Sequence, residues 1–231
     1  MISLKNISSS DLSLIGNKSK NLFFFNKAGF NIPEGVILFA EDIMDIDTIE
    51  IPNYHSYAIR SAAYGEDGRH SFAGIFKSLL NVSKEDVKKS ILEVYDSFFT
   101  KKSLVYQKIK QTNIIPQILV QEMIESKYSF VLYITDSSTI SLSITEGECS
   151  QIVSGTSLTY DIEFYIEDIE GGFDEINSNK DYKSIGFTDF LNKLFNYLKS
   201  NDKLIANGLI DIEATFDGTQ WWLLQYREIN I

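Results

Sequence analysis

The chain has 231 residues, of which 44% are hydrophobic, and this is enough apolar material to bury a core in one large domain or two small lobes. Its formal net charge of −11 argues against binding to nucleic acid or to an anionic membrane, because neutralising phosphates requires clustered cations. The single cysteine, Cys149, excludes an internal disulfide, and no apolar stretch reaches the roughly 18 to 20 residues of a membrane-spanning helix. With no signal-peptide pattern at the N-terminus, we expect a cytoplasmic protein.

The first third of the chain combines one helical pattern with several extended ones. Residues 16–29 are predicted to form a helix, because Leu22, Phe25 and Ala28 share one face and Gly29 ends the pattern. Three strands are predicted next, at residues 35–40, 56–62 and 75–82.

A long amphipathic helix is predicted from Ser83, which begins a pattern that resembles a capping box with Asp86. Apolar residues recur at helical spacing along it, at Val87, Ile91, Val94, Tyr95 and Phe98. The helix gives way to a strand pattern near residues 112–118. We therefore expect two lobes, residues 1–115 and residues 116–231.

The second half is dominated by strand patterns. The predicted elements are strands at 117–124, 128–136 and 139–147, a helix at 189–200, and a hairpin of strands 208–216 and 220–228. The dipeptide Asp217-Gly218 is a strong turn signal for that hairpin. The order of elements indicates an α+β protein.

Four blocks of the sequence carry a family resemblance. They are "IGNKSKNLFFFNKAGFNIPEGVIL", "IRSAAYGEDGRHSFAG", "LVQEMI" and "LIDIEATFDGTQWWLLQYREI". In this order they resemble the ATP-binding domain of the phosphoenolpyruvate synthase and pyruvate phosphate dikinase family. The resemblance implies an ATP-grasp fold, in which two α+β lobes hold ATP between them, with magnesium as the second cofactor.

The resemblance assigns Lys18 and Arg60 to the phosphates of the nucleotide, as catalytic and binding residues. An ammonium can serve as a compact counter-charge, and a guanidinium can bridge two phosphate oxygens. Small residues after Arg60 would let backbone N–H groups approach an anion, and here we expect Ser71, Ala73 and Gly74 to bind. Two alternatives remain, namely a solvated Lys18 and a structural ion pair between Arg60 and the acids at 66 and 67.

The block at residues 119–124 corresponds to the strand that faces adenine in the family, so Gln121, Glu122 and Met123 are expected to bind the base. A buried strand without a ligand is the alternative.

The last block is expected to bind the metal. Asp211 and Glu213 alternate with isoleucines, so both carboxylates face one side of a strand. We assign Glu213 and Gln225 as magnesium ligands, Asp211 as a nucleotide-binding residue and Arg227 as a catalytic residue that offsets charge or contacts phosphate. An exposed hairpin face with ordinary acids is the alternative.

This assignment makes a prediction about the hairpin loop. Glu213 and Gln225 share a face only if the loop has three residues, 217–219, or if a bulge restores the same parity. A regular two-residue turn would direct Gln225 away from Glu213.

The family resemblance also implies a partner. Its members pass phosphate from ATP to a histidine on a mobile domain, and then to pyruvate or another small molecule, such as a glutamine amide, bound elsewhere. We expect neither a phosphohistidine domain nor a final-acceptor domain in this chain, because His55 and His70 are its only histidines and neither has a carrier context.

Two departures from the family pattern leave other functions open. Only part of the family's glycine-rich segment remains in "ITEGECSQIVSG", and the acidic residues 161–186 have no counterpart. The alternatives are an ATP-grasp ligase that forms an acyl phosphate, and a domain that binds nucleotide without turnover.

Overall fold

The computed structural model describes residues 1–65, 74–111, 113–135, 139–165, 185–201 and 209–229. The chain forms two compact units: unit 1 is Met1–Lys27 with Ile32–Met123, and unit 2 is Ala28–Asn31 with Ile124–Ile231. The expected division after residue 115 would place strand β5 (Ile118–Glu122) in the second lobe, whereas β5 pairs with two strands of unit 1. In the described part of the chain, no helix is both long and apolar enough to cross a membrane.

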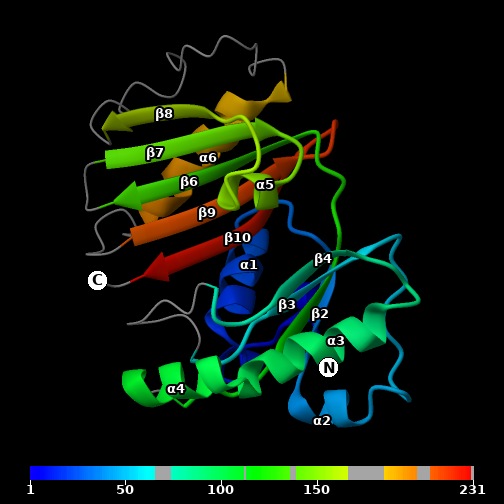
Figure 1. The fold of residues 1–231 in the computed structure, drawn as a ribbon. Helices are drawn as coiled ribbons and strands as arrows, with labels where there is room; N and C mark the ends of the chain where they lie inside the picture. The colour runs from blue at the N-terminus through cyan, green and yellow to red at the C-terminus, as the bar shows by residue number, and fades with distance from the viewer. Residues whose placement is uncertain (66–73, 112, 136–138, 166–184, 202–208, 230–231) are drawn as a thin grey trace. The chain divides into compact units, whose positions relative to one another are not determined.

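Unit 1 is built on a five-stranded antiparallel sheet with the order β1-β2-β5-β3-β4 (Figure 1). Its other strands are β1 (Ile2–Ser3), β2 (Gly35–Leu38), β3 (Tyr57–Ser61) and β4 (Ser78–Val82). Its helices are α1 (Asn17–Lys27), α2 (Ala40–Met44), α3 (Val87–Asp96) and α4 (Lys101–Lys110), with 3-10 turns at Leu4–Asn6, Asp11–Ser13 and Ser97–Phe99.

Helix α3 covers one face of this sheet and forms the core of unit 1. Val87, Ile91 and Val94 are buried in one cluster with Ile59 of β3 and Val120 of β5. The predicted apolar spacing of this helix is therefore confirmed.

The predicted long helix is interrupted after α3. The side chain of Thr100 accepts a hydrogen bond from the backbone N–H of Ser103 and so caps a second helix, α4. The sequence pattern missed this cap because Lys101 and Lys102, directly after Thr100, suit an exposed helix equally well.

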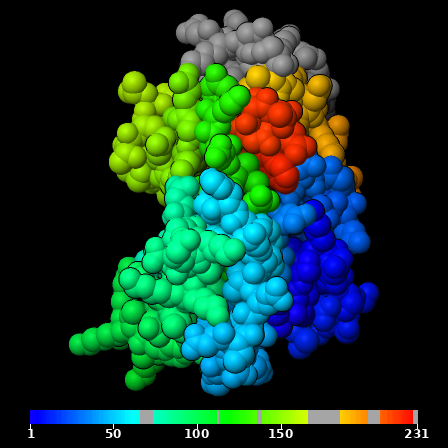
Figure 2. Space-filling model, turned by 90° about the vertical axis from the view of Figure 1, so that its right-hand side faces the viewer, coloured from blue at the N-terminus to red at the C-terminus, as the bar shows by residue number. Residues whose placement is uncertain are grey.

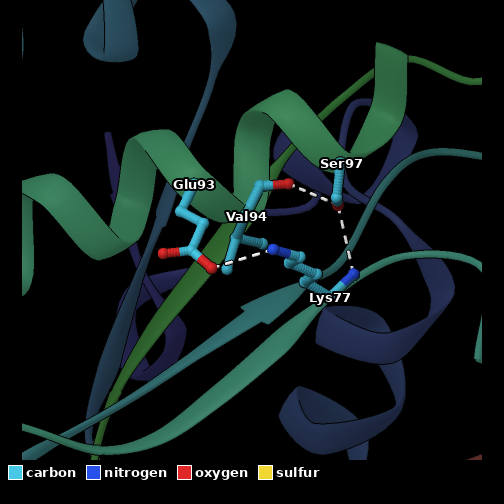
Figure 3. Close-up of polar contacts among 4 residues, drawn as sticks. All are labelled: Lys77, Glu93, Val94 and Ser97. Carbon is cyan, nitrogen blue, oxygen red and sulfur yellow. Dashed lines mark hydrogen bonds and ion pairs between the residues drawn. The ribbon is translucent and has the colours of Figure 1, made fainter. Parts of the chain in front are cut away.

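The segment that leads into β4 is fastened to the end of α3 (Figure 3). The backbone N–H of Lys77 donates to Oγ of Ser97 over 3.1 Å, and that hydroxyl donates to the carbonyl oxygen of Val94 over 2.6 Å. The ammonium of Lys77 also pairs with Glu93 at 2.8 Å. These contacts fix where the chain re-enters the sheet after residue 74.

Unit 2 is built on a second five-stranded antiparallel sheet with the order β10-β9-β6-β7-β8. Its strands are β6 (Tyr128–Thr135), β7 (Thr139–Glu146), β8 (Tyr160–Tyr165), β9 (Leu209–Phe216) and β10 (Trp221–Ile229), and its helices are α5 (Cys149–Val153) and α6 (Phe187–Ser200). Figure 1 shows α6 behind this sheet and α5 in front of it. Neither α5 nor β8 was predicted, and both are short; in β8, Tyr160, Ile162 and Phe164 do alternate with Asp161 and Glu163, which is the pattern of a strand.

Aromatic side chains join α6 to the sheet of unit 2. The rings of Phe187 and Phe190 lie 5.2 and 5.7 Å from that of Trp221 on β10, and 5.6 and 5.9 Å from that of Phe130 on β6. Because side chains alternate along a strand, this packing leaves the opposite face of the sheet to other residues.

Candidate functional site

Four polar side chains gather on the face of the unit 2 sheet that points away from α6. Asp211 and Glu213 come from β9, and Gln225 and Arg227 come from β10. Nη2 of Arg227 lies 3.0 Å from Oδ2 of Asp211, and Nε2 of Gln225 donates to Oε1 of Glu213 over 3.0 Å. Asp211 is 6% exposed and Gln225 is 4% exposed. The structure thus brings together all four residues assigned to the last block, and we call them the β9–β10 row.

A bulge in β10 is the reason that these side chains meet. Phe216 pairs with Trp221, so the loop has four residues, 217–220, and the expected three-residue loop is wrong. The register then shifts between Leu223 and Gln225, which places Gln225 opposite Glu213. The expectation that a bulge could restore this parity is confirmed.

The longer loop has a local cause in the side chain of Asp217. Its Oδ1 accepts hydrogen bonds from the backbone N–H groups of Thr219 and Gln220, over 2.6 and 2.9 Å. Asp217 thereby closes the loop at four residues, as Asx turns commonly do. The dipeptide signal alone does not reveal this.

The β9–β10 row lies in an electronegative environment. Tyr133 of β6 pairs with Asp211, and burial raises the pKa of its phenol, with the charges of Asp211 and Glu213 raising it further. Tyr133 is therefore a neutral hydrogen-bond group beside two carboxylates and one guanidinium. The net charge of −1 favours a cation.

The oxygens of the row fit magnesium. The carboxylate of Glu213 and the amide oxygen of Gln225 are hard ligands, and magnesium takes its remaining ligands from water and phosphate. Among the described residues, no group of three or more His, Cys, Asp or Glu side chains could hold a metal ion by itself. Nε of Arg227 is buried and has no hydrogen-bond partner among those residues, so an anion could accept a hydrogen bond from it.

In unit 1, Lys18 contacts the end of β3, at the residue that follows Arg60. Lys18 is only 7% exposed, and its ammonium donates to the carbonyl oxygen of Ser61 over 2.5 Å. Arg60 directly precedes Ser61 and is half-buried on the sheet face opposite Ile59. Because lysine is rarely buried unless it is paired, this location is inconsistent with a solvated Lys18.

The start of α1 is held against the end of β3 by close packing. A Cβ at Gly16 would lie 2.2 Å from the carbonyl oxygen of Ala62 and 2.4 Å from that of Ala63, so only glycine fits here. The side chain of Gln117 accepts from the backbone N–H of Gly16 over 3.0 Å and donates to the carbonyl oxygen of Leu14 over 2.6 Å. This packing sets the position of Lys18, the second residue of α1.

Gln121 of β5 lies on the same sheet face as Arg60, because it pairs with Ala58, two residues before Arg60. It is 2% exposed, and its Nε2 is a buried donor without a hydrogen-bond partner in the described part of the chain. Gly35 leaves room for it, since a Cβ there would lie 2.9 Å from Cγ of Gln121. A buried donor of this kind is costly unless a ligand satisfies it.

Glu122 and Met123 follow Gln121 and are half-buried. Their backbone N–H groups already donate to the carbonyl oxygens of Glu34 and Ser56, over 2.9 and 3.0 Å. Contacts from these two residues to a base would therefore have to use their other groups.

The segment after Arg60 is described only in part. Ser71 and Ala73 lie outside the described residues, as do the acids at 66 and 67 that were the alternative partners of Arg60. Gly74 has a φ of +68°, and its carbonyl oxygen accepts from the ammonium of Lys102 on α4 over 3.0 Å. The predicted role of this segment stays a prediction.

No sequence pattern pointed to Gln117 or Tyr133. Gln117 is the one polar residue at the start of an apolar strand, and such a residue often has a buried hydrogen-bonding role. Tyr133 occupies the correct face of β6, but its neighbours across the sheet are known only from the pairing with β9.

Residues 39–161, more than half of the chain, match the family described as "Pyruvate phosphate dikinase, AMP/ATP-binding domain". The match includes Arg60 and Gln121, whereas Lys18 and the β9–β10 row lie outside it. None of the curated proteins matches the chain in sequence.

Solved structures share the fold. The chain resembles D-alanine–D-alanine ligase from Helicobacter pylori with 12% identity and a TM-score of 0.50, over 92% of this chain and 54% of the ligase. It resembles L-amino acid ligase from Bacillus licheniformis with 9% identity and a TM-score of 0.51, over 97% of this chain and 45% of the ligase. It resembles dinucleotide forming acetyl-coenzyme A synthetase 1 from Ca. Korarchaeum cryptofilum with 14% identity and a TM-score of 0.51, over 97% of this chain and 100% of the synthetase chain.

These likenesses establish the α+β ATP-grasp fold and, at such identities, nothing about the reaction. The chain spans about half the length of the two ligases and the full length of the synthetase chain.

Proposed function

Because this chain belongs to the family of the pyruvate phosphate dikinase AMP/ATP-binding domain, we propose that it is an ATP-dependent phosphotransferase module. It binds ATP with magnesium and donates a phosphoryl group to a histidine on another domain or subunit. That histidine passes the group on to pyruvate or another small molecule, such as a glutamine amide. Nucleotide binding is the part of this function that the family itself carries.

The β9–β10 row is the observation that carries the proposal. It places two carboxylates, an amide and a guanidinium on one sheet face, and it needs a bulge to do so. Glu213 and Gln225 would hold the magnesium ion, which when bound neutralises phosphate charge. Asp211 keeps Arg227 oriented, and the unsatisfied Nε of Arg227 can then donate to a phosphate oxygen.

Unit 1 supplies further groups for the nucleotide. Lys18 and Arg60 provide cations for the phosphates, aided by backbone N–H groups of the segment that contains Ser71, Ala73 and Gly74. The buried donor of Gln121 suits an acceptor atom of the adenine ring.

The chemistry asks little of this chain beyond positioning and charge stabilisation. The lone pair of an unprotonated histidine nitrogen attacks phosphorus, a P–N bond forms, and the P–O bond to the nucleotide breaks. No base is needed to remove a proton from that nitrogen. The phosphohistidine domain and the final small-molecule acceptor are the partners that the proposal requires.

The test is transfer of label. The chain is incubated with magnesium and ATP labelled at either the β or the γ phosphate, together with candidate histidine domains, and the labelled product is identified. We expect label on a histidine of the partner, with acid-labile and base-stable chemistry, and we expect none with Glu213→Gln. Nucleotide binding without transfer to any histidine domain would overturn the phosphotransferase assignment.

A ligase that forms an acyl phosphate is the second candidate, because the solved structures named above include two ligases. Likeness in fold does not favour that reaction over phosphotransfer. Hydroxylamine trapping with a panel of carboxylic acids distinguishes the two, since only an acyl phosphate gives a hydroxamate.

A further inference from the structure

Helix α4 exposes aliphatic side chains and buries polar ones, which is the reverse of an ordinary surface helix. Leu104, Val105 and Ile109 are 50%, 50% and 68% exposed, while Ser103 is fully buried and Gln107 is half-buried. A surface helix normally buries its aliphatic side chains and exposes its polar ones. An outward apolar stripe on a stable helix indicates a surface that another molecule covers.

Lysines complete this outward face. At 100° per residue, Lys101, Lys102 and Lys108 fall on the same arc as the three aliphatic residues, and all three lysines are exposed. Helix α4 has four lysines in ten residues and no acidic residue. Two of them stand in its first turn, where the helix dipole disfavours positive charge; Lys102 donates to the carbonyl oxygen of Gly74, but helix stability does not explain Lys101. We call Lys101, Lys102, Leu104, Val105, Lys108 and Ile109 the α4 face.

A patch of opposite charge lies on unit 2. It consists of Val153 at the end of α5, Leu158 in the following loop, and Asp161, Glu163 and Tyr165 on β8. Val153, Leu158 and Tyr165 are 63%, 97% and 61% exposed, and Asp161 and Glu163 are exposed on the same face of β8 as Tyr165. The segment from α5 to β8, yellow-green in Figure 2, stands out at the surface of unit 2. We call these five residues the α5–β8 patch.

We propose that the α4 face of one molecule docks on the α5–β8 patch of a second copy of this chain. Both surfaces expose apolar side chains, and their charges are opposite. Apolar contacts would supply the affinity, and the lysine–carboxylate pairs would supply orientation. The chain has 32 acidic and 21 basic residues, so another copy presents a mostly acidic surface to the basic α4 face.

The size and symmetry of this contact define the expected behaviour. A ten-residue helix is only about 15 Å long. One face of such a helix buries less than the roughly 800 Å² per partner of a standard interface. The contact joins two different surfaces, so it either closes around a two-fold axis, where it occurs twice, or continues to larger assemblies. We therefore expect weak, reversible association that high salt weakens further.

Sedimentation velocity over a concentration series, at low and at high salt, measures this association. Lys101→Glu with Lys108→Glu should weaken it at least about tenfold, and Asp161→Lys with Glu163→Lys should do the same, because each change sets like charges against each other. An equal mixture of the two double variants should associate again, because each molecule then offers a surface that matches the other. Leu104→Ser with Ile109→Ser should weaken association at unchanged melting temperature, because these side chains are not in the core.

The matched control is Lys84→Glu with Lys89→Glu, which changes the charge equally at two exposed lysines of unit 1 outside the α4 face. It should leave association unchanged. A wild-type chain that stays monomeric at low salt up to about 100 µM would overturn the proposal. So would an equal loss in the control, or a mixture of the two reversed variants that fails to associate while both variants remain folded.

Discussion

Replacing Gly16 with alanine should weaken ATP binding by displacing Lys18, although Gly16 itself has no side chain to contact a ligand. The added Cβ would lie 2.2 Å from the carbonyl oxygen of Ala62. An ordinary contact between carbon and oxygen is about 3.3 Å, so α1 or the end of β3 must move by about 1 Å. A displacement of that size in a positioned group can cost about a hundredfold, and overpacking adds about 1 to 3 kcal/mol of lost stability.

Calorimetric titration with magnesium and ATP measures the affinity, and thermal unfolding measures the stability. Gly186→Ala is the control, because its φ of +68° strains an alanine in the same protein while its Cβ would meet nothing within 4 Å. We expect Gly186→Ala to lose some stability and to keep its affinity. If Gly16→Ala binds ATP as tightly as the wild type, the position of Lys18 does not matter for the nucleotide, and Lys18 leaves the proposed site.

Three further predictions concern single side chains. Arg60→Ala should lose about 1.5 to 3 kcal/mol of ATP binding measured by calorimetry, and Arg60→Lys should recover little of it, because an ammonium cannot form the paired hydrogen bonds of a guanidinium; recovery of wild-type affinity in the lysine variant would contradict the bidentate contact. Glu213→Gln should abolish the increase in ATP affinity on adding magnesium and leave the affinity in excess chelator unchanged; a normal magnesium response would remove Glu213 from the metal site. Burial raises the pKa of Asp217, but hydrogen bonds from Thr219 and Trp222 outweigh it and lower the pKa to about 2. Since the pKa is depressed in the folded state, the stabilisation is present above about pH 4 and is lost as pH falls toward 2, so Asp217→Asn should destabilise the protein at pH 6 and the difference in unfolding free energy should shrink in acid; a difference independent of pH would show that the charge is not involved.

Strand alternation predicted that Asp211 and Glu213 share a face of the sheet, but it left open whether Gln225 joins them. Ile210 and Ile212 alternate with Asp211 and Glu213, and the requirement that Gln225 join these two acids made a bulge one of two solutions. The loop length could not be predicted from alternation, because it depends on which backbone N–H groups donate hydrogen bonds to the carboxylate of Asp217. A local hydrogen-bonding choice thus decided what the alternation pattern left open.

Other features depend on contacts between residues far apart in the chain. Gln117 reaches Gly16 across 101 positions, and no local pattern encodes such a pair. The boundary of unit 1 moved to Met123 because β5 pairs with β2 and β3, which a scan for the end of a helix does not reveal. The exposed stripe of α4 was hidden in an apparently regular helix, because periodicity says which residues share a face and not which face is outward.

Residues 28–31 belong to unit 2, although the chain on either side of them belongs to unit 1. Asn31 binds Gln220 and the backbone of Leu223, and the ring of Phe30 packs edge-on against Phe190 on α6. The polypeptide therefore passes between the units three times, after residues 27, 31 and 123. Cleavage by a protease at residue 123 would leave residues 28–31, which are part of unit 2, covalently attached to unit 1. Expression of residues 124–231 alone would leave Phe190 of α6 without the ring of Phe30. Dissection of this protein into independently folding halves would need a circularly permuted or rejoined chain, since no single cut separates them.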